Sequence, residues 1–206
     1  MDLSKKIALI IAITVGILVI GTLIYQQRKY EEYKTDDLVH TMATIVENGQ
    51  EVIKGFARLQ QQNIVDRDYL LEELKQHDDY RDSKFFESIP VIAALKSMQK
   101  LSDEKGFTLR TPKDRPRNPE NRAFSYEKDI INYFKTTKED SYQEINRDEG
   151  LVIYAKPVVI GSSCLSCHGD PATSPTGDGK DVLGFDMEGW SNGDVVGAYI
   201  LTSPVE

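Results

Sequence analysis

Cysteine and histidine are scarce in this chain of 206 residues, which has two Cys and three His. No second Cys pair is present for a four-ligand zinc site, and no Gly-Pro or βαβ pattern indicates a thioredoxin-like redox motif. The chain also lacks the constellation of His, Arg and Glu that a small peroxidase would need. We therefore expect no enzymatic activity.

The chain has fewer basic than acidic residues. It contains 25 Lys and Arg and 33 Asp and Glu, which gives a net charge of −8. Without the N-terminal Asp2, Lys5 and Lys6 the counts are 23 and 32, so the remainder carries −9. An acidic surface of this kind argues against nucleic acid and anionic lipid as partners. It suits a weakly associating domain or one that meets a basic redox partner.

Long apolar runs are absent except near the N-terminus. Residues 7–25 read IALIIAITVGILVIGTLIY and contain no charged residue. At about 1.5 Å per residue, a helix of this length roughly spans a bilayer core. Lys5 and Lys6 precede it, which predicts a cytoplasmic N-terminus over residues 1–6, a single-pass membrane anchor and an extracytoplasmic, periplasmic remainder. A removed signal peptide is the alternative, but no A-x-A-like cleavage site follows the run.

Both cysteines fall in one five-residue motif, Cys164-Leu165-Ser166-Cys167-His168. C-x-x-C-H is the attachment signature of c-type haem, in which two thioether bonds hold the haem and the histidine ligates the iron from the proximal side. A bare C-x-x-C is also compatible with a redox pair, half a zinc site or a disulfide. The adjacent histidine and the export segment favour one covalently attached haem c, with His168 as its proximal iron ligand.

Residues 30–62 are predicted to form one long helix that continues directly from the apolar segment. Apolar or small residues recur in it at alternating spacings of four and three, which is a seven-residue repeat. They are Leu38, Met42, Ile45, Gly49, Val52, Phe56 and Leu59. Such a stripe either forms a coiled-coil seam or packs on the helix's own domain, and Gly49 favours the second.

The remaining residues, 63–206, are predicted to complete one α+β domain. A polar connector precedes a helix that begins at Ser88, with Pro90 in its first turn, and ends before Gly106. Pro157 should place a bulge or an edge in its strand. The expected strands are 107–110, 142–146, 151–160 and 195–202, with a helix at 126–136 and a long loop at 169–193. Helices followed by an antiparallel sheet define the α+β class.

Residues 111–122, TPKDRPRNPENR, hold three prolines and cannot form regular structure. An exposed loop is one interpretation. The other is that an arginine of this region binds the haem propionates, because a guanidinium group makes bidentate contacts with carboxylates. The candidates are Arg110, Arg115, Arg117 and Arg122.

Several stretches together resemble a known family. They are FFESIPVIAAL from Phe85, RTPKDRPRNPEN from Arg110, AKPV from Ala155, and CLSCHGDPA with DVLGFDMEGW between Cys164 and Trp190. Over about residues 36–203 the chain resembles extracytoplasmic, c-type-haem-binding PAS-like sensor domains, found alone or at the front of chemoreceptors and histidine kinases.

The resemblance implies a PAS-like antiparallel sheet flanked by helices, one haem, and sensing of redox state or diatomic ligands. It assigns Cys164, Cys167 and His168 to the haem, and the R-N-P-x-N loop adds Arg117 and Asn118 to the expected cofactor-binding residues. In some relatives a cysteine supplies the distal ligand. This chain has no third cysteine.

The distal side of the iron therefore has few candidate ligands. His40 and Met42 lie on the long helix, and His77 lies in the polar connector. Met98 lies on the helix after Ser88, and Met187 in the loop after the haem motif. A vacant distal side, open to a gas and walled by the apolar run 89–93, is the remaining alternative.

Two functions follow from these observations. The first is a membrane-anchored haem sensor of redox state or of a diatomic gas. The second is an electron-transfer cytochrome c subunit beside a membrane respiratory or photosynthetic complex. Either role is compatible with a homodimer or a larger membrane protein complex.

Overall fold

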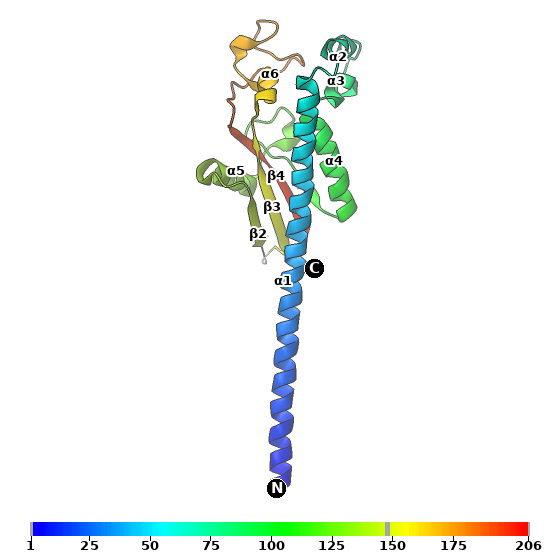
Figure 1. Cartoon of the computed structure of the whole chain (residues 1–206). Helices are drawn as coiled ribbons and strands as arrows, with labels where there is room; N and C mark the ends of the chain where they lie inside the picture. Colours follow the sequence, from blue (N-terminus) through cyan, green and yellow to red (C-terminus); the bar gives the residue numbers. More distant parts are fainter. Residues whose placement is uncertain (1, 147–148, 206) are drawn as a thin grey trace. The chain divides into compact units, whose positions relative to one another are not determined.

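The computed structural model describes residues 2–146 and 149–205, and it has the predicted α+β architecture (Figure 1). Met1 and Glu206, at the outer limits of the predicted segments, lie outside the described residues. The chain divides into two compact units, Met1–His40 and Thr41–Glu206. The second unit contains the sheet, the remaining helices and the C-x-x-C-H motif.

Helix α1 runs without a break from Leu3 to Gln61. In the first unit, residues 7–25 are apolar and almost all exposed, and this stretch is long and apolar enough to cross a membrane. The sequence predicted this continuity, because no proline or glycine pair interrupts residues 22–48.

In the second unit, one face of α1 is buried by the domain itself. Met42 is fully buried, and Ile45 and Gly49 are buried beside it, whereas Leu59 is 38% exposed. The heptad stripe therefore packs mainly on its own domain, which was the second of the two predicted roles. A coiled-coil seam would need these same side chains to be uncovered.

Three further helices precede the sheet: α2 (Arg67–Leu74), α3 (Lys84–Glu87) and α4 (Pro90–Lys105). The prediction that a helix begins at Ser88 is wrong by two residues, because α4 begins at Pro90, with Ile89 as its N-cap. Ser88 instead ends α3, and its hydroxyl donates to the Phe85 carbonyl at 2.7 Å. Gly106 ends α4 in the left-handed conformation, as predicted.

The sheet has four antiparallel strands in the order β1-β4-β3-β2. They are β1 (Thr108–Arg110), β2 (Tyr142–Asn146), β3 (Leu151–Val159) and β4 (Val195–Pro204). The β3–β4 register shifts between Val158 and Val159, one residue after Pro157, so the predicted irregularity is present. The two long strands, β3 and β4, occupy the centre of the sheet.

Alternation along the central strands directs side chains to two different helical layers. On one face, Ile153 and Ile200 form a buried cluster with Phe134 of α5 (Ser125–Thr137). On the other face, Lys156 forms an ion pair with Glu47 of α1 at 3.3 Å. The sheet therefore lies between α5 and the second-unit part of α1.

Close packing between α1 and α4 yields a prediction about Gly49. A Cβ atom at Gly49 would lie 2.4 Å from Sδ and 2.6 Å from Cγ of Met98, which is fully buried. Gly49→Ala should therefore lower the free energy of unfolding by about 1–3 kcal/mol through overpacking. Urea denaturation measures this change.

Gly55 supplies the matched control in the same helix, because a Cβ there meets no atom within 4 Å. Gly55→Ala should raise the free energy of unfolding by up to about 1 kcal/mol through helix propensity alone. Equal effects of the two substitutions would contradict the close approach of α1 and α4 at Gly49.

Candidate functional site

The C-x-x-C-H motif lies where the two central strands end. The chain leaves β3, passes through two short helical turns, η3 (Ser162–Cys164) and α6 (Leu165–His168), and returns into β4 (Figure 1). Two backbone hydrogen bonds join the ends of this connection. Ile160 N donates to Asp194 O at 2.9 Å, and Gly193 N donates to Ile160 O at 2.8 Å. The central strands thus supply a rigid support for the motif.

The loop after the motif folds back onto it. Gly189 N donates to Gly169 O at 3.0 Å, and Trp190 N donates to His168 O at 2.9 Å. Gly169 closes α6, and a side chain there would place Cβ 2.5 Å from the Leu165 carbonyl oxygen. The glycine after the histidine is therefore required by backbone packing.

His168 is held on two sides. Its Nδ1 lies 2.7 Å from Oε2 of Glu188. Its ring stacks on the indole of Trp190, with centroids 5.0 Å apart and planes inclined by 16°. A histidine whose Nδ1–H donates to a carboxylate presents Nε2 as the nitrogen that can ligate a metal.

Glu188 is ionised in this arrangement. Burial by itself would raise the pKa of its carboxyl, but hydrogen bonds from His168 and Arg117 outweigh that effect and lower the pKa to about 2. A carboxylate beside a proximal histidine makes the imidazole more basic and fixes its orientation.

Arg117 joins three parts of the site. Its Nε donates to Glu188 Oε1 at 2.7 Å, one Nη donates to Asp181 Oδ2 at 2.5 Å, and the other Nη donates to the Cys167 carbonyl at 2.8 Å. Its guanidinium also lies 5.0 Å from the Phe185 ring centroid. The side chain of Asp181 has no exposed surface, so this is a buried ionic network.

The predicted propionate-binding arginines thus have different surroundings. Arg117 lines the cavity described below, but it directs its donors to Glu188, Asp181 and Cys167. Among the others, Arg110 pairs with Glu127 at 2.5 Å, and Arg115 faces a different cavity. Arg122 is exposed, and Asn118 accepts from Glu120 N as the cap of a short 3-10 turn. Only Arg117 of these five residues borders the motif.

A cavity of about 600 Å³ opens directly beside the motif. Cys164, Cys167 and His168 line one side of it, and both cysteines are free thiols. The facing wall is largely apolar and comes from α1 and from the α2–α4 segment. Its apolar residues are Ile53, Ile64, Val65, Leu70, Phe85, Ile89, Pro90 and Val91.

These features fit a covalently attached haem. The volume lies within the roughly 300–1,000 Å³ of typical cofactor sites, and the apolar wall suits a porphyrin face. Two cysteine side chains and an oriented imidazole are the groups that c-type attachment uses. The residues that would hold the group are Cys164, Cys167 and His168.

The proposed distal ligands lie elsewhere among the described residues. Met42 and Met98 are fully buried in the packing between helices, and Met187 is buried in the loop after the motif, where its N–H donates to Gly179 O. His40 is exposed on α1. His77 Nε2 lies 2.8 Å from Glu73 Oε1. None of these five lines the cavity as the structure describes it.

Four residues of the site were not assigned a role from the sequence. Asp181, Glu188 and Trp190 occur in the DVLGFDMEGW stretch, whose resemblance to a family could have marked them. Arg67, at the start of α2, lines the cavity and lies 6.0 Å from the Phe85 ring centroid. A cavity-lining guanidinium is the group expected to meet a propionate, and no local pattern in the sequence distinguishes it.

Comparison with known proteins gives one family and one fold relative. The sequence model of the Tll0287-like family matches residues 27–204. The crystal structure of the cyanobacterial haem protein Tll0287 has a similar fold, with a TM-score of 0.57 and 17% identity over 82% of this chain and 95% of that chain. No curated protein matches. These findings agree with the resemblance drawn from the sequence motifs, and the chain therefore belongs to the Tll0287-like family.

Proposed function

We propose that this chain is a membrane-anchored extracytoplasmic protein with one haem c, and that it senses redox state or a diatomic gas. The observation that carries the proposal is the cavity in which both thiols and His168 face an apolar wall. A bound haem would supply an iron that changes its oxidation state or takes up a diatomic ligand. The name of the similar protein, a haem protein, supports the same cofactor here.

The residues around the cavity have separate tasks in this proposal. Cys164 and Cys167 fix the cofactor to the end of β3, and His168 presents Nε2 to the iron while Glu188 holds Nδ1. The side chains at 89–91 contribute to the apolar wall on the facing side. Apart from His168, no Met or His of the described residues lines the cavity, and in this proposal the side opposite His168 takes up the small ligand.

Helix α1 offers a route for the signal. Ile53 and Gln60 line the cavity, and Gln60 Nε2 donates to the Ser88 carbonyl at 3.0 Å. A change in the contents of the cavity would shift these contacts, and α1 continues from them to the apolar segment at residues 7–25. In this proposal the helix connects the haem cavity to a membrane anchor.

Electron transfer within a larger membrane complex is the second candidate function. The stacked rings of His168 and Trp190 favour it, because His168 lines the cavity and Trp190 is partly exposed. The two functions differ in the expected distal side. An electron carrier keeps six ligands in both oxidation states, whereas a gas sensor needs an open or weakly held position.

Carbon monoxide distinguishes these two functions. We expect the reduced protein to bind CO rapidly, with no competing protein ligand, in optical and resonance Raman spectra. Val91→Phe, which places a larger side chain in the cavity wall, should slow CO binding about tenfold or more without releasing the haem.

Val159→Phe is the matched control for this experiment, because Val159 is 50% exposed at the end of β3 and does not line the cavity. Its CO binding rate should equal that of the parent protein. A six-coordinate reduced protein that does not bind CO would contradict gas sensing and favour the electron carrier.

A further inference from the structure

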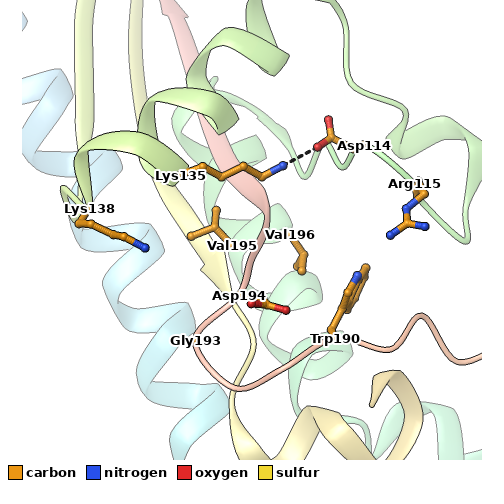
Figure 2. A pocket seen from close by; sticks show the side chains of 9 residues that line it. All are labelled: Asp114, Arg115, Lys135, Lys138, Trp190, Gly193, Asp194, Val195 and Val196. Atoms are coloured by element: carbon orange, nitrogen blue, oxygen red, sulfur yellow. Dashed lines mark hydrogen bonds and ion pairs between the residues drawn. The ribbon is translucent and has the colours of Figure 1, made fainter. Parts of the chain in front are cut away.

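A second cavity, of about 330 Å³, lies beside the His168–Trp190 stack. Trp190 lines it, together with residues of α5 and the start of β4 (Figure 2). His168 lines the haem cavity but not this one, and Trp190 lines this one but not the haem cavity. Since the two rings are stacked 5.0 Å apart, they form a two-ring connection between the cavities.

The charges around this second cavity differ from those of the chain as a whole. Three cations, Arg115, Lys135 and Lys138, and two carboxylates, Asp114 and Asp194, line it. Lys135 pairs with Asp114 at 2.7 Å, and one carboxylate oxygen of Asp194 accepts from Ser191 N at 2.8 Å. Among the described residues, no carboxylate lies within ion-pair distance of Arg115 or Lys138.

Lys138 also occupies an unusual backbone position. It caps α5 in the left-handed conformation, with φ at 63°, where glycine is the preferred residue. A non-glycine residue there costs of order 1 kcal/mol. A requirement for the cationic side chain at the cavity would account for this choice. In Figure 2, Lys138 and Arg115 lie on opposite sides of the opening, with Val195 and Val196 between them.

From these observations we propose that the second cavity binds a small anionic one-electron carrier, and that Trp190 couples this carrier electronically to the haem through His168. Arg115 and Lys138 supply the unpaired positive charges that attract the anion. In the oxidising direction, one electron would pass from a bound haem through His168 and Trp190 to the carrier. No bond is formed or broken and no proton is transferred.

The electronic part of this inference rests on the proposed haem function, whereas the anion site does not. Both redox sensing and electron transfer require a route by which single electrons reach the iron. The net charge of −8 alone would favour a cationic reagent over an anionic one. If this cavity binds an anion in preference to a cation, the preference must therefore come from the residues that line it and not from the net charge of the chain.

The anion site is tested by calorimetric titration of the holoprotein with hexacyanocobaltate(III), a redox-inert trianion. We expect Lys138→Gly and Arg115→Gln each to weaken binding about two- to fivefold, the range typical of one exposed charge contact. Lys138→Gly relieves the left-handed backbone strain, so it should fold at least as well as the parent protein. Lys128→Gln, on the exposed surface of the same helix, removes the same charge and should bind normally.

The coupling through Trp190 is tested by stopped-flow oxidation of the reduced protein. Hexacyanoferrate(III) should oxidise Trp190→Leu at least about fivefold more slowly than the parent. The two rate constants are first corrected for any difference in reduction potential between the proteins. The cationic oxidant tris(phenanthroline)cobalt(III) should react with both proteins at the same corrected rate. Lys138→Gly should slow the oxidation of the protein by hexacyanoferrate(III) but not its oxidation by the cationic cobalt complex.

Two results would overturn the inference. Absence of hexacyanocobaltate(III) binding, or binding that Lys138→Gly and Arg115→Gln leave unchanged, rejects the anion site whatever the function of the haem. Anion binding combined with equal corrected oxidation rates for Trp190→Leu and the parent rejects the route through Trp190. Failure of the haem proposal itself would appear separately, as a protein that contains no haem.

Discussion

Replacing both cysteines, as Cys164→Ser with Cys167→Ser, is expected to abolish haem attachment and to destabilise the domain. The cavity of about 600 Å³ would lose the group that fills it, and its apolar wall would face solvent or an empty space. Large deletions in protein cores cost about 3–5 kcal/mol, and we expect a decrease in the free energy of unfolding in that range. Chemical denaturation monitored by circular dichroism measures it.

Ser162→Ala is the matched control, because Ser162 is an exposed residue two positions before the motif, does not line the cavity, and leaves both cysteines in place. It should keep the haem and the stability of the parent. A double serine variant that unfolds at the same denaturant concentration as the parent would mean that the haem is peripheral to the fold.

Arg117→Met is expected to lower the free energy of unfolding by about as much as the double serine substitution. The substitution keeps much of the side-chain volume but removes the cation between Asp181 and Glu188. Asp181 would remain as a buried charge without its partner, and breaking a buried ion pair in this way costs about 3–5 kcal/mol. The Cys167 carbonyl also loses its donor, so the motif and the ring of His168 should lose their fixed orientation.

Two further variants separate loss of charge from loss of geometry. Arg117→Lys keeps the charge but not the forked donors, so it should recover only part of the stability and of the haem spectrum. Arg115→Met, two residues earlier in the same loop and exposed, should leave both unchanged. Arg117→Met with parental stability and an unchanged Soret band would show that the network does not support the motif.

The order of helices and strands could be predicted because it depends on local patterns. The apolar run at residues 7–25, the apolar strand-like run at residues 151–160, and Pro90 and Gly106 at the two ends of a helix each predicted an element close to the one observed. The error at Ser88 has a local cause as well. Its hydroxyl bonds backward to Phe85 and closes α3, and a sequence pattern does not distinguish this bond from an N-cap.

The environment of the motif could be predicted only in part. C-x-x-C-H identified the residues that would hold a haem, but it did not indicate that Glu188 contacts the second nitrogen of His168. The role of Arg117 could not be derived, because its partners Asp181 and Glu188 lie 64 and 71 residues further along the chain. Their meeting depends on how the loop at 111–122 and the loop after the motif fold together.

The most direct test of this account is acid–acetone extraction of the purified holoprotein, followed by a haem stain of the denatured polypeptide on a gel. We predict that the haem remains with the polypeptide, because thioether bonds to Cys164 and Cys167 survive denaturation. Haem that passes completely into the acetone phase would contradict covalent attachment, and with it the central claim about the C-x-x-C-H motif.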